Sequence, residues 1–278
     1  MIKLDVKDYL KVLEPLKTLE INTLFAQSVI RGQVSGTVYV DNAQEPGTFF
    51  IVHPYGMSLL FGDLNNGEFT AGLQQYLLNS GKERDKAEWL QSYPCEWSEK
   101  IEKLAGSFIV ESSNMENAAS DNTAKIIKHT RVNFQFDKER YEAIKQQMKN
   151  PTCNIVKTSA EMFEKISGAV IPRFFWTDGN DFEKNGAGYS LLCNEEIAST
   201  AFSAFLLDGK LEIGIETSDK YRGRGFAVSV CSALIDYCLI NGLEPVWSCR
   251  LENTASYQLA QKLGFVPTIE IPYYQLPV

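Results

Sequence analysis

The segment that runs from residue 211 to residue 240 constrains the fold of this chain more than any other. It opens with LEIGIET, which is typical of a β-strand, continues through the glycine loop RGRG at 222–225, and ends in a long apolar helix. Asn241-Gly242 follows, and glycine suits the left-handed conformation at a helix end. The apolar face of the predicted helix repeats every four residues, at Phe226, Val230, Leu234 and Cys238.

Three strands with tight turns are predicted before the glycine loop. Their ranges are Gly188–Cys193, Ile197–Phe205 and Leu211–Thr217. Asp208-Gly209 lies between the second and third of them and is a strong hairpin signal. Short turns of this kind join antiparallel neighbours, so the pattern predicts an antiparallel meander.

Further elements are predicted in the second half of the chain. A strand begins at Val156, and the helix Ser159–Ile166 follows with Thr158 as its N-cap. Asn253 is expected to cap a helix that ends at Gly264. The predicted ranges of the remaining elements are Val246–Cys249 for a short strand, Ala255–Leu263 for the capped helix, and Phe265–Gln275 for a final strand region broken by Pro267 and Pro272.

The first half shows a similar order of helices, strands and a glycine-bearing loop, which favours a distant internal repeat. Its loop, FGDLNNG at 61–67, contains an aspartate and no basic residue. The polar run ESSNMENAASD at 111–121 predicts a boundary between two domains. We expect an N-terminal α/β domain at 1–118 and a second domain at 119–278. The elements predicted in the first half are helices at Val6–Leu19, Ile21–Ile30 and Phe69–Leu78, and strands at Gln33–Val40, Thr48–Val52 and Met57–Phe61.

Bulk properties exclude several classes of protein. The net charge is −8, which argues against a sequence-independent grip on nucleic acid. Neither histidine, His53 or His129, has neighbours at metal-ligand spacing, so we expect no metal site. No apolar run resembles a signal peptide or a membrane span, which predicts a soluble cytoplasmic protein. Four of the six cysteines lie in apolar runs and are expected to be buried free thiols: Cys193, Cys231, Cys238 and Cys249.

The loop at 222–225 has the features of a diphosphate-binding site. Glycines let successive backbone N–H groups converge, the helix start adds unsatisfied N–H groups, and two arginines raise the local potential. A plain glycine turn with solvated arginines explains the loop alone equally well. No Gly-Lys-Ser/Thr follows, which excludes a Walker loop. The antiparallel strands before the loop exclude a dinucleotide-binding crossover.

Two motifs together indicate a family. RGRGFA at 222–227 resembles the R/Q-x-x-G-x-G/A signature of the GNAT superfamily of N-acetyltransferases. NTASYQLAQKLGF at 253–265 resembles the N-x-x-A/S-x-x-L-(Y/A)-x-K-x-G-F helix of the same family, at the expected spacing. The two motifs cover roughly residues 186–275. The whole chain is also similar to the subfamily that contains the zwittermicin A self-resistance acetyltransferase.

The resemblance implies a mixed, mostly antiparallel sheet flanked by helices and splayed between its fourth and fifth strands, where acetyl-CoA enters. The first domain would then be a degenerate copy of the second. The pantetheine arm of acetyl-CoA would bind along Gly214–Thr217 like an added strand, with a bulged strand polarising the thioester. The cofactor-binding residues that the resemblance implies are Ile215, Thr217, Arg222, Gly223, Arg224, Gly225, Phe226, Ala227, Asn253 and Ser256.

The proposed reaction is direct acetyl transfer to the primary amine of a small molecule. A carboxylate takes the amine proton, and Glu212 and Glu216 are the candidates, because their four-residue spacing puts both on one strand face. Glu216 is the first choice. The family's usual acid, a tyrosine, is replaced by Ala260, whereas Ser256 matches the serine of relatives that acetylate ribosomal-protein N-termini. Ion pairing or helix capping explains each of these residues without catalysis.

Three points stay open at this level. RFFW at 173–176 either walls the acceptor site or packs in the core. Because Ala260 replaces the tyrosine, a non-catalytic module that binds or senses acyl-CoA is the alternative to an enzyme. The N-terminal half either contributes to acceptor binding or forms a homodimer, and it is expected not to bind acetyl-CoA itself.

Overall fold

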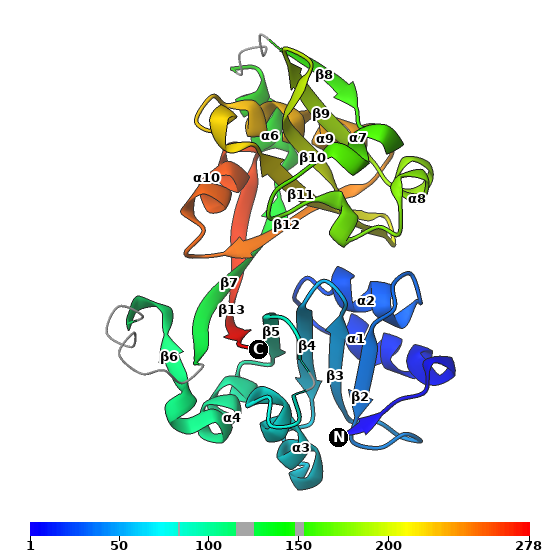
Figure 1. Ribbon diagram of the computed structural model, residues 1–278, viewed down its shortest axis with the longest axis vertical. Helices are drawn as coiled ribbons and strands as arrows, with labels where there is room; N and C mark the ends of the chain where they lie inside the picture. The colour runs from blue at the N-terminus through cyan, green and yellow to red at the C-terminus, as the bar shows by residue number, and fades with distance from the viewer. Residues whose placement is uncertain (83, 115–124, 148–152) are drawn as a thin grey trace. The chain divides into compact units, whose positions relative to one another are not determined.

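The computed structural model describes residues 1–82, 84–114, 125–147 and 153–278 (Figure 1). These residues form two compact units, each of mixed α/β structure, which confirms the predicted fold class. The predicted junction at residue 118 lies outside the described residues, so the division into 1–118 and 119–278 stays a prediction. Unit 1 comprises Met1–Val132, Arg250–Glu252 and Ile269–Val278, and unit 2 comprises Asn133–Cys249 and Asn253–Thr268.

Unit 1 contains an antiparallel meander followed by a parallel strand. The meander is β2 (Thr37–Val40), β3 (Thr48–His53) and β4 (Met57–Gly62). After the helix α3 (Gly67–Leu77), the chain returns as β5 (Glu88–Tyr93), which pairs parallel to β4. The last residues of the chain pair antiparallel to β5 through Tyr273–Leu276. The starts and ends of β2, β3 and β4 agree with the predicted ranges to within one residue, except that β2 begins at residue 37 rather than 33.

One face of this sheet is closed by α3 and by α4 (Glu96–Ala105). Phe69 and Leu73 from α3 and Trp97 from α4 belong to a buried cluster that also includes Leu90 and Tyr274. The other elements of unit 1 are β1 (Ile2–Lys3), η1 (Val6–Val12), α1 (Leu13–Lys17), α2 (Leu24–Ile30), η2 (Gly106–Phe108), β6 (Ile109–Glu111), η3 (Ser112–Asn114) and the first part of β7 (Ile126–Phe136).

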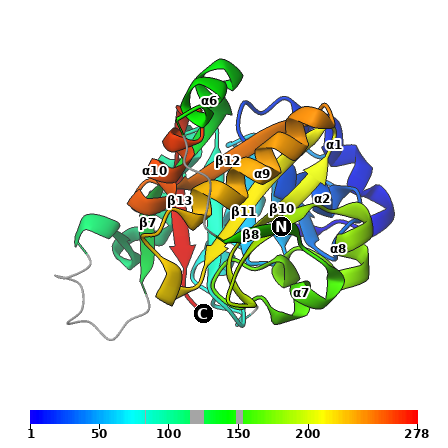
Figure 2. The ribbon, with the colours of Figure 1, turned by 90° about the horizontal axis from the view of Figure 1, so that it is seen from above.

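Unit 2 repeats this order of elements. The meander is β9 (Gly188–Cys193), β10 (Glu196–Leu207) and β11 (Lys210–Thr217). Asp208 and Gly209 both have positive φ, as the predicted hairpin turn requires. The long helix α9 (Phe226–Ile240) then packs against all three strands, and Figure 2 shows it lying across them. β12 (Glu244–Arg250) returns parallel to β11.

The remaining elements of unit 2 surround this arrangement. The helix α7 (Ala160–Lys165) is capped by Ser159, whose Oγ accepts from the N–H of Met162, and not by Thr158 as predicted. Thr158 is buried, and its hydroxyl hydrogen-bonds Ser190. The remaining elements of unit 2 are α6 (Lys138–Lys145), β8 (Asn154–Lys157), α7 (Ala160–Lys165), η4 (Pro172–Phe174), α8 (Gly179–Asn185), η5 (Asp219–Tyr221), α10 (Thr254–Lys262) and the first part of β13 (Phe265–Leu276).

Several predicted element boundaries were wrong. β13 is continuous, so Pro267 and Pro272 do not break it. The range Val6–Leu19 is a 3₁₀ helix followed by one short α-helix rather than a single helix. The elements β5, α4, β7, α6 and α8 were not predicted from the sequence, although Trp97, Ile101 and Ala105 of α4 are buried at four-residue spacing.

The cysteines differ from the expectation at one position. Cys193 forms a disulfide with Cys153 and is not a free thiol. Cys231, Cys238 and Cys249 are buried and free, as predicted. The two bonded cysteines are brought together because β8 pairs antiparallel with β9, a pairing that spacing along the chain does not reveal.

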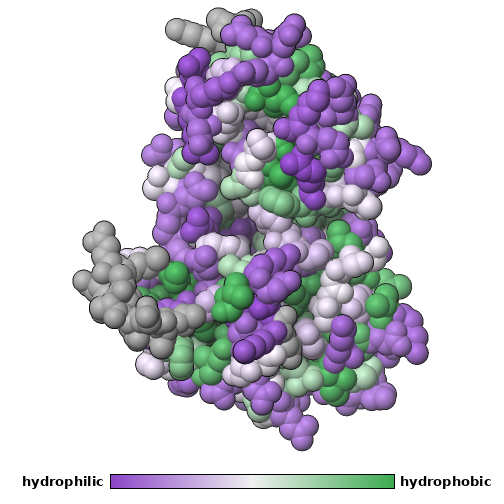
Figure 3. Space-filling view, viewed as in Figure 1, coloured by the Kyte–Doolittle hydropathy of each residue, from purple (hydrophilic) through white to green (hydrophobic). Residues whose placement is uncertain are grey.

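None of the described helices is both long enough and apolar enough to cross a membrane. In the view of Figure 3, hydrophilic and hydrophobic residues are interspersed on the visible face. Such scattered apolar exposure is ordinary for a folded chain.

Candidate active site

The start of α9 forms an open cradle of backbone N–H groups. Gly223 and Gly225 have φ angles of 76° and 80°, a conformation that glycine adopts without steric cost. An added Cβ at either position would meet no atom within 4 Å. Gly225 is the N-cap of α9 and offers no side chain to cap it, so the N–H groups of the first turn have no intrahelical partner. The space and the donors therefore fit a diphosphate.

The two arginines of the loop are held differently. The side chain of Arg222 contacts the carbonyl of Thr217 through Nε at 3.2 Å and the carboxylate of Asp219 at 2.9 Å. The guanidinium of Arg224 lies 5.4 Å from the ring centre of Tyr221, a buried residue. Both arginines are exposed and placed beside the helix start. An anion bound there would gain their positive potential.

The strands β11 and β12 part next to this loop. Their parallel register joins Lys210–Glu212 to Glu244–Val246 and includes no later residue of either strand, both of which are fully described. The other edge of β11 stays paired with β10 as far as Thr217. The C-terminal half of β11 thus offers its β12-side edge to another extended chain. This is the splay that the family resemblance implies.

The predicted pantetheine-binding residues lie at this splay. Ile215 and Thr217 face Ala201 and Ser199 of β10, and the Thr217 hydroxyl hydrogen-bonds Ser199 at 2.8 Å. Asn253 caps α10, because its side chain accepts from the N–H of Ser256 at 3.1 Å. The cap that the sequence predicts at Asn253 is confirmed.

Glu216 is held by backbone N–H groups. Its Oε2 accepts from the N–H groups of Ala169 and Val170 at 2.7 and 2.9 Å, and its Oε1 accepts from the N–H of Thr217 at 3.1 Å. Gly168 has no side chain, and a Cβ there would lie 2.4 Å from the Glu216 carboxyl carbon. The carboxylate therefore fixes a loop in addition to any role in proton transfer. The contact between Glu216 and the loop at residues 168–170 was not predicted from the sequence, where Gly168 was the available signal.

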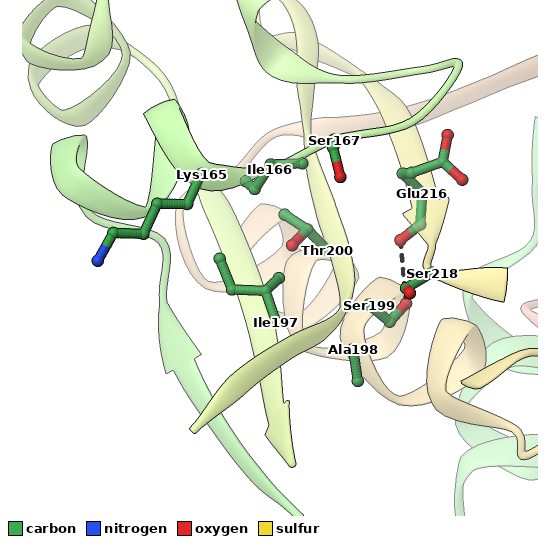
Figure 4. A pocket seen from close by; sticks show the side chains of 9 residues that line it. All are labelled: Lys165, Ile166, Ser167, Ile197, Ala198, Ser199, Thr200, Glu216 and Ser218. Carbon is green, nitrogen blue, oxygen red and sulfur yellow. Dashed lines mark hydrogen bonds between the residues drawn. The ribbon is translucent and has the colours of Figure 1, made fainter. Parts of the chain in front are cut away.

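A small pocket adjoins Glu216, with a volume of ≈ 70 Å³. Figure 4 shows the Ser199 hydroxyl bonded to the Glu216 carbonyl, while the Glu216 carboxylate points away from Ser199. Pockets for drug-sized ligands measure roughly 300–1,000 Å³, so this pocket alone does not hold an acceptor of that size.

Glu212 is separated from Glu216 by an aromatic ring. A Cβ at Gly214, which lies between the two glutamates on the same strand face, would be 2.4 Å from Cζ of Phe202. Glu212 itself is buried. The structure therefore does not bring the two predicted carboxylates together as one site. The pairing register of β10 and β11 shifts by one residue between Ser203 and Phe205. The extra residue of this bulge, Ala204, lies on β10 and not on β11.

The aromatic run at 173–176 contributes mainly to the core. Phe175 packs against Phe202 and Phe205, with ring centres 5.7 and 5.5 Å apart. Trp176 donates its Nε1–H to the carbonyl of Ser203 at 2.6 Å. Phe174 is exposed. Packing thus accounts for two of the three aromatic residues that were considered as a wall of the acceptor site.

Ser256 keeps a proton that it can donate. Its Oγ accepts from the indole N–H of Trp247 at 3.3 Å, which leaves the hydroxyl proton for another group. Residue 260, where the family resemblance places a tyrosine, is an alanine and has no phenol to donate a proton. Its side chain is fully buried. Tyr257 packs edge-on against Phe134, with ring centres 5.3 Å apart.

A metal centre has no candidate among the described residues. No group of three or more histidine, cysteine, aspartate or glutamate side chains there is arranged to hold an ion.

The sequence model of the family described as GNAT acetyltransferase matches residues 15–274, which is nearly the whole chain. The chain belongs to the GNAT acetyltransferase family. It is therefore an N-acetyltransferase of GNAT type, and acetyl-CoA-dependent N-acetyl transfer is the general activity of this family. The match includes the first half, where no cofactor motif was found.

Three relatives illustrate the similarity. The chain is 26% identical over 253 residues to the "Uncharacterized N-acetyltransferase YdfB" of Bacillus subtilis (strain 168), covering 90% of this chain and 89% of that one. A GCN5-related N-acetyltransferase-like protein from Streptococcus suis 89/1591 shares the fold with a TM-score of 0.71 at 20% identity, over 98% of this chain and 99% of that one. A tandem GNAT protein from the clavulanic acid biosynthesis pathway has a TM-score of 0.59 at 10% identity, over 99% and 97%.

Proposed function

We propose that this enzyme binds one acetyl-CoA at the start of α9 and moves the acetyl group directly to the primary amine of a small molecule. The observation that carries the proposal is the open N-terminus of α9. Gly223 and Gly225 leave room for a diphosphate, and the N–H groups of the first helical turn converge on that space. The arginines at 222 and 224 add positive charge beside it. Phe226 and Ala227 begin the helix and would present their N–H groups to the diphosphate.

The thioester would lie along the unpaired edge of β11. The pantetheine arm has amide groups that can hydrogen-bond the backbone from Gly214 to Thr217, as an added strand does. Asn253 and Ser256 would flank that arm from α10. In this arrangement the reacting carbonyl lies near the parting of β11 and β12, where an acceptor amine can approach.

The chemistry needs a neutral amine and a protonated or stabilised thiolate. The amine nitrogen attacks the thioester carbon, the C–N bond forms, the C–S bond breaks, and the amine proton passes to a base. We propose Glu216 as that base, acting through a water. Among the described residues its Oε2 accepts two backbone N–H groups and its Oε1 accepts one, which leaves Oε1 room to accept from a water. Glu212 is the second candidate. Ser256 is proposed to donate a proton to the leaving thiolate, which also leaves readily without an acid.

The first half of the chain has a separate role in this proposal. We propose that residues 1–118 are a degenerate GNAT domain, that 119–278 form the working acetyltransferase domain, and that the first domain contributes to acceptor binding or to a homodimer. We also propose that the chain is similar to the zwittermicin A resistance subfamily and that the protein is located in the cytoplasm.

A non-catalytic acyl-CoA-binding or sensing module is the second candidate function. The buried Ala260 favours it, because the usual proton donor is missing there. Release of free thiol from acetyl-CoA separates the two. The full chain would be mixed with acetyl-CoA and a panel of primary amines, and thiol release would be followed with a chromogenic disulfide. Amine-dependent release supports the enzyme, whereas tight binding of acetyl-CoA with no release across the panel supports the sensor.

A further inference from the structure

A cluster of polar and aromatic side chains lies on one face of the sheet of unit 1. Trp89 and Gln91 alternate along β5 with Leu90, which belongs to the core under α3 and α4. Trp89 and Gln91 therefore lie on the opposite face of the sheet. Tyr273 pairs with Gln91 across the two strands, and its ring stacks on that of Trp89 with centres 4.9 Å apart.

Two further residues of unit 1 contact the same indole. The guanidinium of Arg250 lies 4.7 Å from the ring centre of Trp89, and the imidazole centre of His129 lies 5.3 Å from it. Among the described residues, Arg250 takes part in no ion pair that meets a 4.0 Å limit. A guanidinium stacked on an indole keeps its N–H edge available for a planar partner such as a carboxylate.

Gln91 is the second, independent observation. Its side chain is fully buried, and neither its Oε1 nor its Nε2 has a hydrogen-bond partner among the described residues. A buried amide without partners is destabilising, because it loses its hydrogen bonds to water and gains none in the folded chain. The side chain lies beside Tyr273 and two residues from Trp89, so its amide belongs to the cluster. An aliphatic residue would pack there without that cost, which points to a ligand that the amide recognises.

The proton arrangement of His129 follows from its neighbours. Burial lowers the pKa of His129, with Arg250 acting in the same direction and Glu252 opposing both. The ring is therefore neutral near pH 7. Its Nδ1 lies 3.4 Å from Oε1 of Glu252, a carboxylate that also accepts from the N–H of Thr130. A carboxylate beside Nδ1 favours the proton on that nitrogen, which leaves the Nε2 lone pair to accept a hydrogen bond.

We propose that this cluster binds a small molecule that carries both an amine and a carboxylate, in the manner of a free amino acid. The amine donates to Nε2 of His129, the carboxylate accepts from Arg250, and the amide of Gln91 bonds either group. This inference rests on the proposed function, since it names the chemical class of the enzyme's amine substrate. Arg250 is the last residue of β12, and Glu252 directly precedes Asn253 of the family motif.

Calorimetry on the full chain tests the proposal without depending on turnover. The probes are free L-amino acids and the amines that each would give on loss of its carboxyl group, with and without coenzyme A. We expect at least one amino acid to bind, and its decarboxylated counterpart to bind at least about tenfold more weakly, because it lacks the partner of Arg250. Arg250→Gln and Gln91→Leu should each weaken amino acid binding at least tenfold.

The controls separate this proposal from the function on which it rests. Arg140→Gln, which changes an exposed arginine on α6, should bind the amino acid as the unaltered chain does. Gln91→Leu should melt at the same or a higher temperature, since it removes a buried unpartnered amide. The proposal is overturned if no amino acid binds, or if amines with and without a carboxylate bind equally. If either of these results occurs while acetyl-CoA still binds and simple amines release thiol, this proposal fails alone. The proposed function fails if acetyl-CoA does not bind.

Discussion

The two units of this chain share an order of elements but differ at the strand edge and helix start where we propose that acetyl-CoA binds. Each has a three-stranded antiparallel meander, a helix, and a returning strand that pairs parallel to the last strand of the meander. In unit 1 this parallel register runs over Met57–Phe61 and Trp89–Tyr93, almost the whole of both strands. In unit 2 it stops after Glu212. The same topology is thus closed in one unit and open in the other.

The loops that precede α3 and α9 differ in the same way, since the helix start is capped by a side chain in unit 1 and uncapped in unit 2. In unit 1, Asn66 caps α3 with its own side chain, which accepts from the N–H of Phe69 at 2.9 Å. A Cβ at Gly62 would lie 2.2 Å from the carbonyl oxygen of Gly47, so the chain is closely packed where β4 ends and the loop begins. In unit 2, Gly225 caps nothing and the space above it is empty. A helix start binds an anion only where the chain has not already satisfied its own N–H groups.

The largest expected effect comes from filling the open loop. Gly225→Glu should raise the Kd for acetyl-CoA about 1,000-fold, or about 4 kcal/mol, because the side chain fills the cradle and its charge repels the diphosphate. Gly225→Asn adds a neutral side chain that tolerates positive φ, and should weaken binding less. Calorimetry measures both, with thermal melting to show that each variant folds.

The matched control is Gly67→Glu, at the first residue of α3, where a Cβ would also meet no atom within 4 Å. It should leave acetyl-CoA binding unchanged. Equal losses of acetyl-CoA affinity in the two variants would mean that both helix starts bind the cofactor. That result would contradict the proposed difference between the two units.

The next effect concerns pH and belongs to unit 1, which contains both histidines of the chain. Burial lowers the pKa of His53 from 6.5 to about 4. Between these values the unfolded chain binds more protons, so stability contributed by His53 is present above pH 6.5 and is lost as the pH falls toward 4. At about 1.4 kcal/mol per pKa unit, the loss is about 3 kcal/mol.

Urea unfolding at a series of pH values checks this. His53→Asn should show a smaller fall in the free energy of unfolding between pH 6.5 and 4 than the unaltered chain. Parallel pH profiles for the two chains would contradict the assignment to His53.

Acetyl-CoA itself should stabilise the chain. At 100 times its Kd, a single bound ligand adds about 2.7 kcal/mol to the free energy of unfolding. Thermal melting follows this shift, and titration calorimetry gives the number of sites, which we expect to be one per chain. A stoichiometry near two would show that unit 1 also binds the cofactor, despite its closed loop and the aspartate at residue 63.

The smallest effect compares two helix caps. Asn66→Ala and Asn253→Ala each remove a side-chain acceptor from a helix start and should each cost about 1 kcal/mol of stability. Only Asn253→Ala should also weaken acetyl-CoA binding, since that asparagine belongs to the proposed pantetheine site. If neither variant changes the Kd, Asn253 is a cap and nothing more.

Local signals explain which parts of the fold could be predicted. The α9 helix, the Asp208-Gly209 turn and the Asn253 cap were predicted, and each depends on residues within one turn or one hairpin. β13 was predicted with breaks because two prolines lie in it, yet the strand runs continuously from Phe265 to Leu276. The disulfide of Cys153 was missed because it depends on the pairing of β8 with β9.

The sequence by itself determined the glycine loop before α9, since the glycines that adopt positive φ and the apolar helix that follows them are consecutive in the chain. Only the tertiary structure decided what the side chains around the reaction do. Two glutamates four residues apart looked like a pair, but the ring of Phe202 separates them, and backbone N–H groups of a distant loop hold Glu216. His129 looked isolated in sequence and lies against Trp89 and Glu252. The physical reason is that charges and hydrogen bonds act through space over a few ångströms, and strand pairing brings residues more than a hundred positions apart to that distance.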